Sequence, residues 1–169
     1  FLTTTSCEDI LETESEQIVF DPALDQKTDS MFYTLAILKS VQLAIDQNVL
    51  INEMRGDLTE TNMYTQTDLR ELANFSATAA NKYDSAYVYY RIINNCNYFI
   101  AKVDTAMKNN RNENIFKAEY AAVKAIRAWT YLQMVTTYGR VPFVTTPILT
   151  KEEAERSYPS KDIKGICEY

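Results

Sequence analysis

The chain contains no histidine, which removes the commonest general base, the usual partner of a nucleophile and the commonest metal ligand. Its three cysteines, Cys7, Cys96 and Cys167, do not have a zinc-binding spacing. The glutamates at 113, 119, 152, 153 and 155 are expected on solvated helix faces and make no convincing acid–base pair. We therefore expect no catalytic residue, no metal and no cofactor.

Positive charge is also scarce. The net charge is −6 and the sequence pI is about 4.8, which disfavours nucleic-acid binding because that needs a basic face. No apolar run reaches membrane-spanning length. With 46% hydrophobic residues but only 3 Gly and 4 Pro in 169 residues, the composition favours a packed, mostly α-helical domain with long helices.

Apolar residues spaced three and four apart predict the helices. We expect long helices from Asp29 or Ser30 to about 46–48, over 84–107 and over 113–138, with a short helix at 68–74. Residues 141–146 read as extended, 151–156 as one or two helical turns, and 160–169 as a further helix that Ser160 caps and the sequence does not complete.

The 113–138 segment is the strongest helix signal. Alanines alternate with larger apolar residues on nearly every face, so we expect a helix buried between several neighbours. Gly139 stands where a left-handed C-terminal cap belongs, and Pro142 prevents the helix from resuming. Trp129 is expected in the core, where its replacement by alanine would cost about 3–5 kcal/mol. A short polar connector makes 84–107 and 113–138 a helical hairpin, the unit of tetratricopeptide-like stacks, although the strict repeat consensus is absent.

The first residues allow two interpretations. Thr4, Thr5 and Ser6 precede Cys7 as small residues precede a lipid-modified cysteine, so residues 1–7 could be a signal-peptide remnant ending in a lipobox-like cysteine. Cys7 could equally be an ordinary cysteine at the chain end. The acidic residues that follow it are expected to form a solvated tether.

Three residues in the first half, Arg55, Gly56 and Asp57, could be read as an adhesion tripeptide, but a structural role is favoured. Gly56 would make a turn with positive φ, and the two charged side chains would anchor loop backbone.

Tyrosines are the most suggestive candidates for binding, because aromatic rings stack on sugars and their hydroxyls form hydrogen bonds. Of the cluster at 83, 87, 89, 90 and 98, we select Tyr83, Tyr87 and Tyr89 as ligand-binding candidates, with core packing as the default for the cluster. Cys96 and Cys167 could pair if Cys7 carries lipid, but we expect free thiols.

Several segments, in order, resemble the SusD/RagB family of outer-membrane lipoproteins from Bacteroidetes. The segments are Cys7-Glu8-Asp9, Glu53 to Leu58 (EMRGDL), Tyr90 to Asn97 (YRIINNCN), and Ala118 to Pro142 with its Arg127-Ala128 and Tyr138-Gly139-Arg140-Val141-Pro142. Ala86 and Tyr87 stand where the family commonly has a tryptophan, and Arg140 replaces the frequent Asp or Gly.

The resemblance implies a cell-surface protein anchored to the outer membrane through lipid on Cys7. It would bind oligosaccharides, or in some branches peptides, and pass them to a SusC-like TonB-dependent transporter. Residues 8–169 would then form the N-terminal helical domain of a longer SusD-like protein, with tetratricopeptide-like helix pairs and irregular loops. Arg55, Gly56, Asp57, Arg127, Gly139 and Pro142 would be structural. A helical protein–protein scaffold without nutrient binding is the alternative.

Overall fold

The computed structural model describes residues 27–56, 58–109 and 116–169, without the side chains of residues 27 and 105–109. The described part is mostly α-helical, as expected. Its helices are α1 (Lys27–Arg55), α2 (Thr67–Ala73), α3 (Ala86–Asn109), α4 (Lys117–Tyr138), α5 (Lys151–Ala154) and α6 (Ile163–Cys167). Two short strands, β1 (Val141–Pro142) and β2 (Ser160–Lys161), pair antiparallel, with Val141 opposite Lys161. Residues 1–26, which include Cys7, and Asp57 lie outside the described residues.

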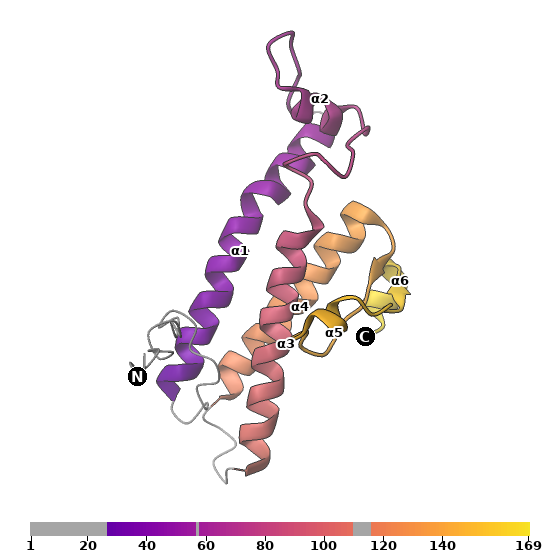
Figure 1. Ribbon diagram of the computed structural model, residues 1–169. Coiled ribbons are helices and arrows are strands. Elements are labelled where there is room, and N and C mark those ends of the chain that lie inside the picture. The colour runs from indigo at the N-terminus through magenta and orange to yellow at the C-terminus, as the bar shows by residue number, and fades with distance from the viewer. Residues whose placement is uncertain (1–26, 57, 110–115) are drawn as a thin grey trace, which may run out of the picture.

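The three long helices α1, α3 and α4 lie side by side and alternate in direction (Figure 1). The short helix α2 sits at the C-terminal end of α1, and α5, α6 and the strand pair gather beside α3 and α4. No helix in the described part is both long and apolar enough to span a membrane. The helical hairpin expected from 84–138 corresponds to α3 and α4, whereas a tetratricopeptide-like stack is not established by this arrangement.

Helix α3 is the centre of the fold. Its buried side chains recur at three- and four-residue spacing: Tyr89, Ile92, Ile93, Cys96, Asn97, Phe99, Ile100 and Val103. Some of them form one apolar cluster with Ile37 and Ala44 of α1 and Val123 of α4, while others form a second cluster with Tyr131, Met134 and Val135 of α4. Cys96 in this stripe and the exposed Cys167 are both free thiols.

The expectation that α4 is buried on nearly every side is wrong. Its alanine-rich side, with Ala121, Ala122, Ala125 and Ala128, is exposed, and Leu132 is 39% exposed. Trp129 is only partly buried and lines cavities on both sides of α4. Alanine is apolar but small, so leaving it in water costs little free energy.

Helix α1 also differs from its predicted extent. It begins at Lys27 and continues to Arg55, so it starts before Asp29 and Ser30 and includes residues 49–51. Ile37, Ala44 and Ile51, seven residues apart, are its buried contacts. The helix continues past its predicted end because its last apolar turn packs against α2.

Side chains of α3 and α4 fix the segment that follows Pro142. Asn94 accepts from the amide of Ile148 at 2.7 Å and donates to its carbonyl at 2.9 Å. Asn97 donates to the carbonyl oxygens of Val144 and Thr146 at 3.0 and 3.2 Å. The Tyr131 hydroxyl donates to and accepts from the Val144 backbone, both at 2.8 Å. These bonds satisfy buried backbone groups that have no helix or sheet partner.

The C-terminal signals of α4 are largely as predicted. Gly139 has φ +79° and its amide donates to the Val135 carbonyl, although its ψ of −109° is not left-handed helical. Pro142 is the last residue of β1, and its carbonyl oxygen accepts a hydrogen bond from the Tyr90 hydroxyl. Asp162, and not Ser160, caps α6 through a bond from the Gly165 amide, because Ser160 is engaged in β2.

Candidate functional site

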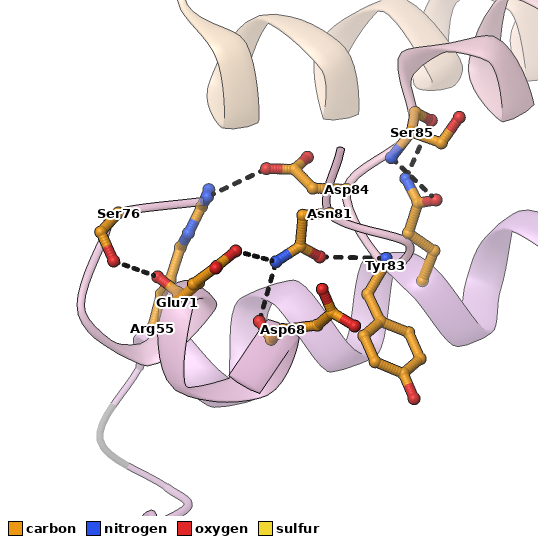
Figure 2. A network of polar contacts seen from close by, with 9 residues as sticks. Arg55, Asp68, Glu71, Ser76, Asn81, Tyr83, Asp84 and Ser85 are labelled. Carbon is orange, nitrogen blue, oxygen red and sulfur yellow. Dashed lines mark hydrogen bonds and ion pairs between the residues drawn. The ribbon is translucent and has the colours of Figure 1, made fainter. Parts of the chain in front are cut away.

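The segment 76–85, between α2 and α3, contains the most developed polar network in the described part of the chain (Figure 2). Asn81, only 4% exposed, organises it. Its amide nitrogen donates to the Asp68 carbonyl at 2.9 Å and the Glu71 carboxylate at 3.0 Å, and its oxygen accepts from the Tyr83 amide at 3.0 Å. A buried amide with its hydrogen bonds satisfied holds the segment against α2.

An ion pair connects the end of α1 to this segment. Arg55 Nη2 lies 3.3 Å from Asp84 Oδ2, and the two side chains are 21% and 12% exposed. Figure 2 shows the two side chains pointing toward one another. Arg55 is therefore structural, as expected, but it anchors a segment 29 residues away and not its own loop.

Gly56 has a different role from the predicted one. The positive-φ residues of the described part are Phe75 and Gly139, so Gly56 does not take that conformation. A Cβ at Gly56 would lie 2.8 Å from the Asn52 carbonyl oxygen. Glycine is required there because the backbone passes too close for a side chain.

The start of α3 is fixed by a side chain from α1. Gln47 accepts from the Ser85 amide at 3.2 Å and donates to the Ser85 carbonyl at 3.1 Å. These two hydrogen bonds give the Ser85 backbone groups partners at the start of α3, because backbone groups at a helix terminus lack intrahelical partners. The loop is thus held from α1 and α2 at once, so its side chains keep a defined arrangement.

A cavity of about 520 Å³ opens beside this network. It is lined by Ala79, Asn81, Lys82, Asp84, Ser85, Ala86 and Tyr138. Asp84 Oδ1 and Tyr138 Oη are buried and have no hydrogen-bond partner in the protein. Burial, reinforced by the neighbouring Asp84 carboxylate, raises the pKa of Tyr138, so its hydroxyl stays protonated and can donate.

The three predicted tyrosines do not come together. Tyr89 is fully buried and its hydroxyl accepts from Asn48, so its assignment as a ligand contact is wrong in this structure. Tyr87 is 69% exposed on α3. Tyr83 is partly buried, with the Lys82 ammonium 4.8 Å from its ring centroid and its hydroxyl on Gln66. Tyr83 and Tyr87 are adjacent in sequence to residues that line the cavity, but neither of them lines it.

Sequence reasoning missed Gln47, Asp84 and Tyr138 as site residues. Asp84 was predicted only as the first residue of the helix over 84–107, and Tyr138 only as part of a family-like segment. No sequence signal links Gln47 to Ser85, because their contact joins α1 and α3 across 38 residues. Arg127, predicted to be structural, is buried and donates from Nη1 to Asn97 Oδ1 at 2.8 Å.

The cavity lining contains the Asp84 carboxylate, the Tyr138 hydroxyl and the ammonium of Lys82, which also pairs with Asp68 at 3.6 Å. Such an arrangement binds hydroxyl, amide or ammonium groups of a small polar molecule. Within residues 27–56, 58–109 and 116–169, no cluster of three or more Cys, Asp or Glu side chains is placed to hold a metal ion.

The fold and this cavity define a mostly helical protein with a polar, pre-formed pocket at the junction of its long helices. Comparison with protein-family models, with curated proteins and with solved structures found no match for the chain.

Proposed function

We propose that this chain is the helical scaffold of a SusD-like nutrient-binding lipoprotein. It holds an oligosaccharide, or a peptide, at the cell surface and delivers it to a TonB-dependent outer-membrane transporter. Lipid on Cys7 anchors it to the outer membrane, and the protein performs no chemistry on its ligand.

The observation that carries this proposal is the cavity beside segment 76–85. Asp84 and Tyr138, which line it, each have one buried oxygen without a hydrogen bond, Asp84 Oδ1 and Tyr138 Oη, and leaving such atoms unpaired costs about 1–3 kcal/mol each. A ligand hydroxyl that accepts from Tyr138 and donates to Asp84 satisfies both. The volume of about 520 Å³ lies within the range of small-molecule sites, roughly 300–1,000 Å³.

The order of family-like segments supports the same proposal, and the structure adds a connection between two of them. Arg55, from the EMRGDL segment, pairs with Asp84, which raises the pKa of Tyr138 in the Tyr-Gly-x-x-Pro segment. Tyr138 lines the cavity, and Arg55 is connected to it through Asp84.

The experiment is calorimetric titration of the protein with panels of neutral oligosaccharides and short peptides, comparing wild type with Tyr138→Phe. This substitution removes one oxygen that has no protein partner, so the fold is retained while one ligand hydrogen bond is lost. We expect Kd to rise about 3- to 10-fold, the equivalent of one hydrogen bond.

Tyr64→Phe is the matched control, because Tyr64 is 86% exposed and does not line the cavity. It should leave Kd unchanged. Absence of binding across both panels, or a bound ligand whose Kd is the same in wild type and Tyr138→Phe, refutes the proposed site.

One observation favours the alternative, a helical scaffold for protein–protein contacts. The outer side of α1 exposes large apolar residues at helical spacing, each 44% exposed or more: Met31, Leu35, Leu38, Ile45 and Val49. Exposed apolar patches of this kind mark interaction surfaces. Light scattering of wild type and a Leu35→Glu/Leu38→Glu variant distinguishes the two functions: loss of a complex in the variant, with ligand binding absent in both, supports the scaffold.

A further inference from the structure

A second cavity, of about 630 Å³, lies between α4 and α6. It is lined by Lys124, Arg127, Ala128, Trp129, Tyr131, Leu132, Phe143, Ile166, Cys167 and Tyr169. None of these residues lines the cavity beside segment 76–85, so the two cavities are separate.

The charge of this cavity is set by Arg127. The residue is 8% exposed; its Nη1 donates to Asn97, and its guanidinium carbon lies 5.9 Å from the ring centroid of Tyr169. No carboxylate in the described part forms an ion pair with it. A guanidinium has five N–H donors, so a buried one that bonds a single neutral amide still has donors for an anion.

Further positive charge lies at or beside the same space. Lys124 lines the cavity, with its ammonium over the ring of Tyr120. Lys161 Nζ lies 4.3 Å from the ring centroid of Phe143 and 5.2 Å from that of Tyr169, both of which line it. The lining contains no aspartate or glutamate, although the whole chain has a net charge of −6. The site is therefore locally cationic in an acidic protein.

The remaining walls are apolar. The apolar side chains are those of Trp129, Leu132, Phe143 and Ile166. Leu132 is 39% exposed, because no described residue covers that part of its side chain. Apolar walls with a few placed charges are the general form of a site for an amphipathic ligand.

We propose that this cavity binds a carboxylate with an apolar tail. The carboxylate pairs with Arg127, with Lys124 beside it, and the tail lies on Trp129 and Leu132. A guanidinium and a carboxylate form a bidentate pair with two parallel hydrogen bonds, because both groups are planar. This site is independent of the proposed nutrient cavity and goes beyond the proposed function.

Trp129 makes the proposal directly measurable, because it is the only tryptophan in the sequence and lines the cavity. The probe is octanoate, titrated to ~10 mM while tryptophan emission is recorded and heat is measured in parallel, a range that covers Kd values of about 1 mM. Octanamide, which has the same tail and no charge, is the matched ligand. We expect saturable binding of octanoate and at least tenfold weaker binding of octanamide.

Replacing Arg127 would endanger the fold, so two surface substitutions test the site instead. Leu132→Glu places a carboxylate at the cavity and should weaken octanoate binding by at least ~10-fold through like-charge repulsion. Lys124→Gln should weaken it by up to ~5-fold, the scale of a partly screened ion pair. Lys117→Gln, an exposed lysine of α4 outside the lining, is the control and should bind as wild type does.

Three results would overturn the proposal: no saturable binding by emission and heat, equal binding of octanoate and octanamide, or unchanged binding in Leu132→Glu. Tyr138→Phe should leave octanoate binding unchanged, so failure of this site and failure of the nutrient cavity are distinguished by separate variants.

Discussion

Helices α3 and α4 lie side by side and contribute to the same two clusters, yet they differ in how much of their surface is buried. On α3, large side chains such as Tyr89, Phe99 and Ile92 are fully buried, with neighbours on more than one side. On α4, one side packs while the alanine-rich side with Ala121 and Ala122 faces water. The difference shows that the size of apolar side chains, and not their number, marks the central helix here, because burial free energy scales with apolar area.

The largest expected effect is on α3. Phe99→Ala removes a fully buried ring and should lower the free energy of unfolding by about 3–5 kcal/mol. Trp129→Ala on α4 should cost roughly 1–2 kcal/mol, since a partly buried side chain loses less area. Urea denaturation of both variants measures the free energy of unfolding, and an equal decrease in the two would contradict the difference in burial between α3 and α4.

A second substitution tests the polar contacts that join α3 to α4. Asn97→Ala removes the amide that contacts Arg127, Val144 and Thr146, leaving a buried guanidinium and backbone carbonyls without their partner. We expect a loss of about 2–4 kcal/mol. Asn95→Ala is the control, because Asn95 is exposed on the same helix, and a similar loss in both variants would show that Asn97 is not the link.

The pH dependence of stability tests the burial of α3 in another way. Burial raises the pKa of the Cys96 thiol from 9.0 to about 12, although Arg127 opposes the shift. The thiol ionises first in the unfolded state, so its contribution is complete below pH 9 and is lost as pH rises toward 12. Between pH 9 and 10, wild type should lose about 1 kcal/mol more than Cys96→Val.

Cys167→Val is the control for that experiment, because Cys167 is exposed and its replacement removes no buried thiol. Parallel profiles of wild type and Cys96→Val would show that the Cys96 thiol is accessible to water, which contradicts the buried stripe of α3.

The smallest expected effect is on the exposed side of α4. Ala122→Gln should change the free energy of unfolding by no more than about 0.5 kcal/mol, as surface substitutions do. The same change in a helix buried on every side would cost about 1–3 kcal/mol by overpacking. Thermal unfolding at fixed pH measures the difference, and a large loss would show that α4 is covered on this side.

Much of the fold could be predicted because its signals are local. The spacing of apolar residues gave the existence of the long helices, and Gly139 with Pro142 gave the end of α4. The helix boundaries were less accurate. The real end of α1 depends on packing of Ile51 and Met54 against Leu72 of α2, a contact that local propensity does not contain.

The candidate site was mostly beyond sequence reasoning. Of the predicted tyrosines, Tyr83 lies in segment 76–85 and Tyr87 lies in the first turn of α3, whereas Tyr89 lies in the core because successive residues of a helix point in different directions. The residues that form the cavity and its support come from two helices and a loop: Arg55 and Gln47 from α1, Asp84 from segment 76–85, and Tyr138 from α4. Their meeting is a property of the packed helices.

By itself, the sequence determined a mostly helical protein without a histidine, with long amphipathic segments and with Arg127 inside an alanine-rich helix. Only the tertiary structure decided which helix is central, which alanines face water and which polar atoms remain unpaired beside a cavity. The physical reason is that helix formation follows from residues a few positions apart, whereas burial and pairing depend on residues brought together from distant parts of the chain.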